Sequence, residues 1–377
     1  MTKLSDAGGW CYAGEEQGRG RKVPLCRMIQ TQKYTNMSTV VIDLAYGKAA
    51  LRGESMHLSG IPWSEVSEER EADAGQERIS RIIPLMQVEH VVVNPQVTLS
   101  GALLQALMTR GIGVTLLGQK GLLGMVQPTL AAKGRLRLAQ YRCGCDAEWC
   151  LRQARVIVAT KINNQAFMLR RRKNPPQDSF FREMKRLQKA TLNAGSTAEL
   201  MGIEGRATAL YFPEWGKSLP PAFPFTGRTR RPPKDAVNAC LSYLSALCGA
   251  DMLRAVTEAG LDADLGVLHS TEDYRHNLVL DLMEPFRPIL VEGVTRDLLT
   301  HGMLGEESTE YHEDDGGCYL TSRGRIAVIR RYEQRMLSRF VQGEQHTTLR
   351  QCMQRVAVSW KQAVCDPTQY AANFKLS

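Results

Sequence analysis

The chain lacks the long apolar run of a membrane-spanning helix, because no stretch of its 377 residues approaches the roughly 20 consecutive apolar residues that cross a bilayer. Its first residues also lack the basic start and apolar core of an export signal. We therefore expect a soluble protein that stays in the cytoplasm and has no membrane partner.

Two kinds of regular motif are missing as well. The ten cysteines follow no disulfide framework, and the densest group, at 143, 145 and 150, lacks the paired spacing of a structural zinc site. The glycines between 118 and 124 have no strand before them and helix after them, so they do not form a dinucleotide-binding fingerprint. We expect mostly reduced thiols and no bound dinucleotide.

Three regions of different texture follow one another along the chain. Residues 1–36 show neither helical nor strand periodicity, which indicates a disordered tail or, because Met37 opens the first patterned segment, an over-extended start. Residues 37–130 contain short β-branched runs separated by turn residues, with one amphipathic helix over 100–111, a tight turn at 118–121 and a charged loop over 64–78. This pattern predicts a β-rich domain.

Long helical patterns fill residues 131–377, with interruptions near 213–235 and 304–318. The sequence therefore predicts an α+β protein in which a β-rich N-terminal domain precedes a larger all-α domain. The net charge of +9 is a moderate excess of base, which suits a polyanionic partner but also occurs in proteins that have none.

One apolar helical segment, residues 277–284, carries only two acids, Asp281 and Glu284. Burying carboxylates costs several kcal/mol each, by rough estimate, unless a cation or hydrogen-bond donors meet them. The cation is either Arg275 or Arg287 in a structural ion pair, or a divalent metal with His269 as a nitrogen ligand. The proline that follows Glu284 strains the helix there, which can aim this side chain into a cleft.

A third acid, Glu204, lies in another largely apolar helical pattern, where an ordinary partner is Arg206 or another base. Taken with His269, Asp281 and Glu284 it offers one nitrogen and up to three carboxylates, the ligand types that suit Mg²⁺ or Mn²⁺. In phosphodiester chemistry such an ion neutralises charge on the non-bridging oxygens and lowers the pKa of an attacking hydroxyl.

Two basic groups lie near these acids in sequence, and each is either a phosphate-binding surface or a solvated face. The first follows a long helical pattern and the second lies on a loop. Their members are Arg170, Arg171, Arg172 and Lys173 in the first group, and Arg228, Arg230, Arg231 and Lys234 in the second.

Five ordered motifs across residues 38–340 resemble one known family, the CRISPR-associated spacer-acquisition integrases, or "Cas one" family. They are EGRATALYF from Glu204, RRPPKDAVNACLSYL at 230–244, GLDADLGVLH ending at His269, LVLDLMEPFRP at 278–288 and CYLTSRGR at 318–325. The resemblance implies a β-rich N-terminal domain for dimerisation, a helical catalytic and DNA-binding domain, and a prokaryotic cytoplasm.

The resemblance further implies that Glu204, His269, Asp281 and Glu284 are catalytic, with Glu204, His269 and Glu284 as the ligands of Mg²⁺ or Mn²⁺ and Asp281 in support. Many relatives have aspartate at the position of Glu284, and Ala263 replaces a proline of the family's turn.

The implied activity joins the 3′-hydroxyl ends of double-stranded DNA fragments to CRISPR repeat DNA by transesterification. The implied assembly is a homodimer with the small partner "Cas two". The alternatives are a transposon-encoded integrase relative, a general metal-dependent nuclease and a catalytically silent DNA-binding scaffold.

Overall fold

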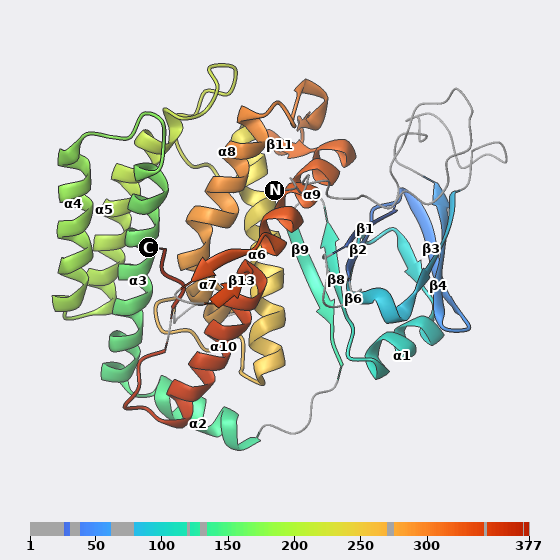
Figure 1. Ribbon diagram of the computed structural model, residues 1–377, viewed down its shortest axis with the longest axis horizontal. Coiled ribbons are helices and arrows are strands. Elements are labelled where there is room, and N and C mark those ends of the chain that lie inside the picture. Colours follow the sequence, from blue (N-terminus) through green and yellow to red (C-terminus); the bar gives the residue numbers. More distant parts are fainter. Residues whose placement is uncertain are drawn as a thin grey trace, which may run out of the picture.

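The computed structural model describes residues 26–30, 38–61, 79–118, 121–128, 134–269, 275–342, 345–371 and 373–376. Figure 1 shows a helical half and a β-rich half side by side, with β8 and β9 between the remaining strands and the helices. The change from strands to helices falls between Val126, the end of β9, and Gly134, the start of α2.

The β-rich half consists of two sheets and one helix. The first sheet has the order β1-β2-β6-β8-β9 and the second the order β5-β4-β3-β7. Strands β2, β6 and β8 run parallel to one another, and the remaining pairs are antiparallel except β3 with β7. The elements are β1 Cys26–Gln30, β2 Ser38–Ile42, β3 Tyr46–Arg52, β4 Ser55–Ile61, β5 Ile79–Pro84, the short η2 Leu85–Gln87, β6 Val88–Val93, β7 Val97–Leu99, α1 Gly101–Thr109, β8 Gly113–Gly118 and β9 Gly121–Val126.

Apolar side chains of both sheets form one core with α1. Helix α1 begins after Ser100, whose hydroxyl accepts a hydrogen bond from the Leu103 amide, and Leu103 and Leu107 on one face of the helix are fully buried. They pack among β-branched residues of the strands, such as Val91 and Val114. The predicted helix is therefore confirmed, and so is the hairpin, in which Gly118 pairs with Gly121.

One expectation for the first residues needs correction. We expected no regular structure in residues 1–36, yet Cys26–Gln30 form β1, which pairs antiparallel with β2 from Cys26 opposite Ile42 to Gln30 opposite Ser38. Main-chain hydrogen bonds to an available strand edge hold such a segment even where its side chains carry no periodic pattern. The charged loop expected at 64–78 lies outside the described residues.

The second half is mainly helical and confirms the predicted α+β class. Its helices are α2 Gly134–Gly144, α3 Ala147–Arg170, α4 Asp178–Ala190, α5 Thr197–Gly216, α6 Ala236–Ala259, α7 Asn277–Met283, α8 Gly293–Thr300, α9 Ser322–Leu337 and α10 Leu349–Cys365. Short 3₁₀ turns lie at η3 Thr191–Asn193, η4 Glu284–Phe286 and η6 Glu306–Ser308, and η5 Pro288–Glu292 is a single π turn.

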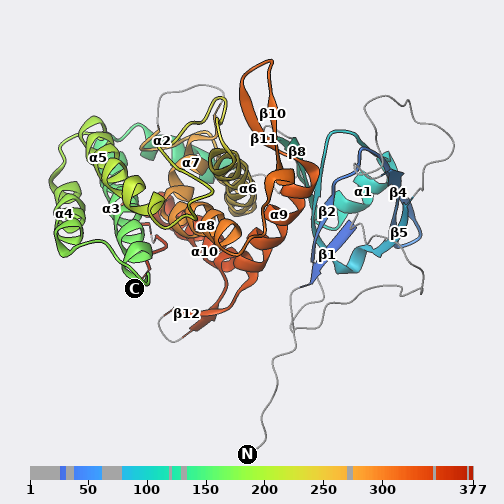
Figure 2. The same ribbon diagram turned by 90° about the horizontal axis from the view of Figure 1, so that it is seen from above.

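The expectation of an all-α second domain is too simple. Two hairpins lie within it, β10 Thr309–His312 with β11 Gly317–Leu320, and β12 Phe340–Gln342 with β13 Gln345–Thr347. These strands have three or four residues, too few for a period of two to show against the helical patterns on either side. Figure 2 shows the β10–β11 hairpin projecting beyond α6 and α9.

Helix α6 lies at the centre of the helical half, next to β9 (Figure 1). By length and composition it alone, among the described helices, passes for a membrane span, and 67% of the relevant window is buried inside the protein. The buried face follows from its sequence, in which Val237, Leu241 and Leu244 recur at helical spacing. A buried helix in a protein core has the same composition.

A buried group of charges on and around α6 links the two halves. The Arg350 guanidinium lies 2.8 Å from the Glu333 carboxylate and 3.5 Å from Asp251, and Arg254 lies 3.8 Å from Glu89 on β6. Because these groups are mostly buried, each charge needs its partner, so the network favours one fixed arrangement of strands and helices.

Candidate active site

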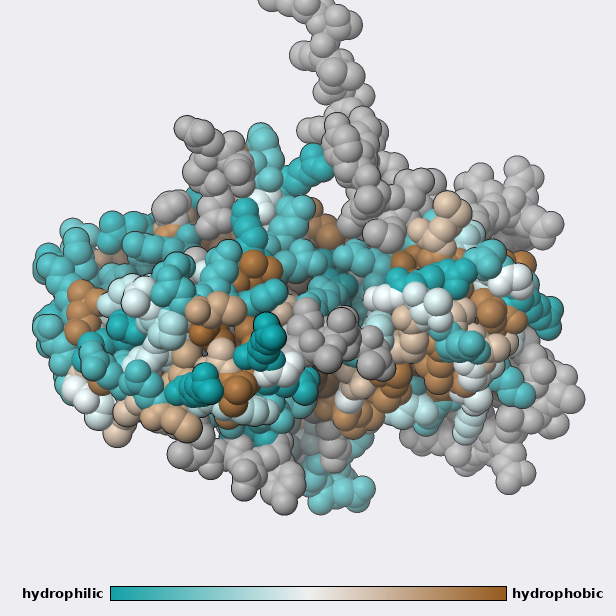
Figure 3. All heavy atoms as spheres, turned by 90° about the horizontal axis from the view of Figure 1, so that it is seen from below, coloured by the Kyte–Doolittle hydropathy of each residue, from teal (hydrophilic) through white to brown (hydrophobic). Residues whose placement is uncertain are grey.

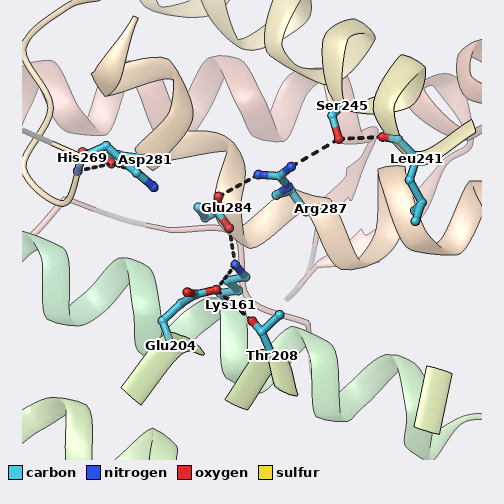
Figure 4. A network of polar contacts seen from close by, with 9 residues as sticks. All are labelled: Lys161, Glu204, Thr208, Leu241, Ser245, His269, Asp281, Glu284 and Arg287. Atoms are coloured by element: carbon cyan, nitrogen blue, oxygen red, sulfur yellow. Dashed lines mark hydrogen bonds and ion pairs between the residues drawn. The ribbon is translucent and has the colours of Figure 1, made fainter. Parts of the chain in front are cut away.

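The four predicted acid and histidine residues form two pairs around one short helical segment (Figure 4). Asp281 of this segment faces His269, and Glu284 of the same segment faces Glu204. Helix α7 is buried, as its apolar pattern predicted, and continues without a break into the 3₁₀ turn η4. Pro285 and Pro288 have no amide hydrogen for a regular α-helical bond, and the winding changes at these residues from α to 3₁₀ and then to π. The prolines therefore change the winding at Glu284 without ending the helix.

Asp281 is the most buried acid of the site, with no solvent exposure. Its Oδ2 accepts hydrogen bonds from the amides of Val267 at 2.6 Å and Leu268 at 3.0 Å, and its Oδ1 accepts one from the His269 amide at 3.1 Å. The carboxylate thus replaces water with three main-chain donors. Asp281 fixes the loop that carries His269.

The imidazole of His269 is oriented by the same carboxylate. Its Nδ1 lies 2.6 Å from Asp281 Oδ1, and among the described residues no hydrogen-bond partner is found for Nε2. This hydrogen bond raises the pKa of His269 above its ordinary value, while burial acts in the opposite direction. A histidine held at one ring nitrogen by a carboxylate presents the other nitrogen as a metal ligand.

Glu204 and Glu284 meet at a residue that the sequence did not single out for this site. The Lys161 ammonium, on α3, bonds Glu204 Oε1 and lies 2.5 Å from Glu284 Oε2. Glu204 comes from α5, where Thr208 donates a further hydrogen bond of 2.8 Å to the same oxygen. Two carboxylates from separate elements therefore share one cation (Figure 4).

The ion-pair alternative is also present in this site. Arg287 Nη1 donates a 2.9 Å hydrogen bond to Glu284 Oε1, and its Nη2 donates one of 3.2 Å to Ser245. Burial favours the neutral form of Glu284, but the charges of Lys161 and Arg287 outweigh it and hold the pKa of this carboxyl well below its usual range. Glu284 is therefore ionised although the residue is buried, with an exposure of 5%.

The donor chemistry suits a hard divalent cation. Glu204 and Glu284 supply carboxylate oxygens around a position where a cation is already bound, and His269 has a fixed ring whose Nε2 has no partner among the described residues. Within the described part of the chain, no three side chains of His, Cys, Asp or Glu converge as a ready-made metal cluster. Lys161 stands between the two glutamates, and His269 turns its Nδ1 toward Asp281.

Arg172 and Arg228, two of the eight predicted DNA-binding residues, are engaged in internal structure. Arg172 donates to the carbonyls of Glu214 and Trp215 at the end of α5, and Arg228 donates to Asn238 and Ser242 on α6. Partial burial is the largest cause that lowers the pKa of each guanidinium to about 10. These two arginines hold helix ends and loops in place.

The other predicted basic residues are at the surface. Arg170 and Arg171 lie over the rings of Phe181 and Phe167, at 4.5 and 5.4 Å from the ring centroids. Lys173 is exposed, and Lys234 donates a 2.9 Å hydrogen bond to the Gly316 carbonyl.

Arg230 and Arg231 line a cavity of about 400 Å³. Tyr243, Asp315 and Tyr319 also line it, so the cavity lies between the loop before α6 and the β10–β11 hairpin. The charges of Glu284 and Glu204 reach the Arg230 guanidinium, although burial and Arg287 outweigh them and lower its pKa. This loop therefore places one cation, Arg230, within the electrostatic influence of both carboxylates.

Lys161 is the site residue that the sequence reasoning missed. It lies in the middle of α3, well before the basic group at 170–173, and is 9% exposed. A signal was available, because Ile157, Lys161 and Asn164 are spaced at helical intervals on one buried face. A lysine on an apolar stripe indicates a buried partner of opposite charge.

The fold defines a two-part protein with a β-rich half, a helical half and an acid and histidine site in the latter. Residues 68–334 match the model of one family, CRISPR associated protein Cas1. The chain belongs to this family, which confirms the resemblance seen in the motifs.

Curated relatives agree with this assignment. A CRISPR-associated endonuclease Cas1 from Thermus thermophilus is 32% identical over 261 residues, which cover 68% of this chain and 76% of the relative. A Cas4/Cas1 fusion from Rhodospirillum rubrum is 34% identical over 269 residues, and there the match spans only 46% of the relative. The chain thus corresponds to about half of the fusion protein.

Solved structures share the fold at lower identity. A casposase bound to integration product has a TM-score of 0.76 and 19% identity, covering 88% of this chain and 91% of that one. A Cas1 protein from Thermotoga maritima has a TM-score of 0.73 and 22% identity, covering 90% and 100%. A chain of a Cas6-RT-Cas1–Cas2 complex has a TM-score of 0.72 and 22% identity, covering 92% and 36%.

Proposed function

We propose that this protein is a metal-dependent DNA integrase and endonuclease that inserts short double-stranded DNA fragments into a CRISPR repeat. One observation carries the proposal: Glu204 and Glu284, from different helical elements, meet around one cation in the same helical half as an imidazole that a buried aspartate orients. The family membership supplies the reaction class, because the curated relatives are named as endonucleases.

Glu204, Glu284 and the Nε2 of His269 would hold Mg²⁺ or Mn²⁺ in this proposal. The bound ion supplies charge neutralisation at the scissile phosphate and a lowered pKa for the attacking 3′-hydroxyl. Asp281 keeps the His269 ring in place through its 2.6 Å contact with Nδ1 and the three amide bonds of its loop. Strand transfer exchanges one phosphodiester for another, so no nucleotide cofactor is required.

The DNA backbone would pass over Arg230 and Arg231, beside the acids. Both guanidinium groups line the cavity next to α6, where they can donate hydrogen bonds to phosphate oxygens. Lys173, Arg170 and Arg171 extend the exposed basic surface at the end of α3. Arg172 and Arg228 contribute by holding the structure under these surfaces.

The proposed assembly is a homodimer that also binds a Cas2 partner and acts in a prokaryotic cytoplasm. The second sheet and the turn after it have large exposed apolar side chains, with Tyr46 at 56%, Ile82 at 62% and Met86 at 81% exposure. Figure 3 shows brown apolar side chains gathered on the β-rich half of the molecule. An exposed apolar surface of this kind fits association with another copy.

The test is a strand-transfer assay with a short duplex, a repeat-bearing plasmid, Mg²⁺ or Mn²⁺, and the small partner added or withheld. We expect Glu204→Gln and His269→Ala to lower the rate by more than the roughly 10–100-fold that loss of an outer partner of a metal site costs. DNA binding should be unchanged in both. Glu148→Gln is the matched control, because Glu148 is an exposed glutamate in the first turn of α3.

Transfer at the wild-type rate by either site variant would disprove the ligand assignment. Insertion into a plasmid without the repeat would instead favour the transposon-type integrase, and cleavage without joining would favour a general nuclease. DNA binding without any reaction in wild type would favour the scaffold.

A second measurement tests the basic surface. The double variant Arg230→Gln/Arg231→Gln should lower the slope of log binding constant against log salt by about 0.9 for each phosphate that the two arginines neutralise. Arg206→Gln is the control, since Arg206 is exposed on α5 and pairs with Glu183 at 3.1 Å. An unchanged slope in the double variant would show that Arg230 and Arg231 belong to a solvated face and do not bind phosphate.

A further inference from the structure

Lys161 occupies the position between the two glutamates that the proposed metal would share. We propose that the Lys161 ammonium is a resident cation that holds Glu204 and Glu284 together before metal binds, and that the divalent ion must displace it. This inference rests on the proposed metal site and adds a residue that sets its affinity.

The contacts place the ammonium on one oxygen of each carboxylate. Nζ of Lys161 bonds Oε1 of Glu204 and lies 2.5 Å from Oε2 of Glu284. An ion held by the two carboxylates would compete with the ammonium for these oxygens. Two cations beside the same carboxylates also repel each other, so each weakens the binding of the other.

The charge balance explains why a cation is required there at all times. Glu204 and Glu284 carry two negative charges, and Lys161 and Arg287 carry two positive ones, so the four groups are neutral together. Without the ammonium, two carboxylates would face each other in a largely buried place, which is unfavourable unless one takes up a proton or another cation enters.

Arg287 cannot take over this role from its own position. Its guanidinium contacts Glu284 Oε1, on the side away from Lys161, and its Nη2 is directed to Ser245 on α6. Figure 4 shows Arg287 and Lys161 on opposite sides of the Glu284 carboxylate. Only Lys161 bridges the two acids, among the residues that the structure describes.

The ordinary alternative is a structural lysine with no relation to metal. In that case removal of the charge would destabilise the protein equally with and without metal. The proposal differs because it requires the metal to compensate for the missing ammonium. A neutral side chain at position 161 should therefore make Mn²⁺ binding tighter and make stability depend on Mn²⁺.

The experiment measures Mn²⁺ binding by isothermal titration calorimetry and thermal unfolding in EDTA or in saturating Mn²⁺, on the full chain. Lys161→Met keeps the length of the side chain without its charge, and Lys161→Arg keeps the charge. Lys189→Met is the matched control, because Lys189 is an exposed lysine on α4.

We expect Lys161→Met to bind Mn²⁺ at least about 10-fold more tightly than wild type, and to unfold at lower temperature in EDTA with recovery in Mn²⁺. We expect Lys161→Arg to bind Mn²⁺ more weakly than wild type, because a guanidinium fork grips two carboxylates more firmly than a point charge. The control should match wild type in both measurements.

Equal or weaker Mn²⁺ binding by Lys161→Met would overturn the proposal. If Lys161→Met does not fold, Lys161→Arg decides, and wild-type affinity in that variant would overturn it. These outcomes leave the proposed function intact as long as Glu204→Gln abolishes Mn²⁺ binding in the wild-type background. Wild-type protein that binds no Mn²⁺ in a Glu204-dependent way would overturn the proposed metal site and this inference together.

Discussion

Gly266→Ala should release the loop that carries His269. A Cβ atom at Gly266 would lie 2.8 Å from Asn277 Cβ, 2.8 Å from Asp281 Oδ2 and 2.9 Å from the Asn277 carbonyl carbon. Ordinary contacts of a Cβ atom are longer than 3.0 Å, and two of the three neighbouring atoms belong to the start of α7, which cannot rotate away. The loop must therefore move off the Asp281 carboxylate.

The magnitude follows from two terms. Forcing an extra methyl into a packed interior costs about 1–3 kcal/mol. Each hydrogen bond to a charged group contributes about 1.5–3 kcal/mol, and a shifted loop would break at least one of the three amide bonds to Asp281. We expect the free energy of unfolding, measured by urea denaturation, to fall by about 3 kcal/mol, and Mn²⁺ binding to weaken because His269 moves with the loop.

Gly249→Ala is the matched control for this prediction. Its added Cβ would meet only the Met283 sulfur, at 3.9 Å, and Gly249 lies inside α6. Alanine in a helix interior is more favourable than glycine by about 0.5–1 kcal/mol, so this variant should be at least as stable as wild type. A Gly266→Ala protein with wild-type urea midpoint and wild-type Mn²⁺ binding would refute the account of the loop.

Two further predictions concern parts of the protein away from the loop. Burial, and after it the charge of Arg254, lowers the pKa of His90 to about 3, so the unfolded chain takes up this proton first as pH falls. The contribution of neutral His90 to the free energy of unfolding is complete above about pH 6.5 and falls below it, by about 2 kcal/mol at pH 5. His90→Gln should remove that part of the pH dependence when urea midpoints are compared at pH 7.5 and pH 5. An unchanged pH dependence in this variant would contradict the assignment. Phe374 is 2% exposed and stacks on Phe286 with ring centroids 4.7 Å apart. Phe374→Ala should therefore lower the free energy of unfolding by about 3–5 kcal/mol in the same assay, whereas Tyr370→Ala, at a residue that is 61% exposed, should lower it far less. Equal urea midpoints for these two variants would contradict the packing argument.

Much of the fold was predictable because its local patterns agree with its tertiary structure. The helix over 100–111 and the hairpin at the glycine pair have strong local signals, and both the helix and the pairing of Gly118 with Gly121 appear where predicted. The hairpins near 309–320 and 340–347 were not predicted, since such short strands gain their stability from neighbours, as β11 does from α6. Strand β1 likewise depends on the edge of β2.

The acids of the site were predictable for a related reason. Asp281 and Glu284 interrupt an apolar helix, and a buried carboxylate always needs a partner. Which partner it takes depends on packing between distant segments, which a local pattern does not contain. Arg287, one of the two expected cations, is three residues from Glu284, whereas Lys161 is brought there by the packing of α3 against α5 and η4.

Helix α3 also fixes the turn that carries Glu284 through a second residue. The side-chain amide of Asn164 donates to the carbonyl of Pro285 and to that of Phe374, each at 2.7 Å. Lys161 and Asn164 are three residues apart, so they project from neighbouring turns of the same face and hold Glu284 and the next residue of its turn.

The positions of Lys161 and Asn164 along α3 therefore determine whether their side chains reach the turn that carries Glu284. Inserting or deleting one residue between the start of α3 and Lys161 would rotate the following side chains by about 100° about the helix axis, which would withdraw the ammonium from both carboxylates and the amide from the Pro285 carbonyl in a single step. The number of residues between the start of α3 and Lys161 is therefore constrained by the contacts with both glutamates.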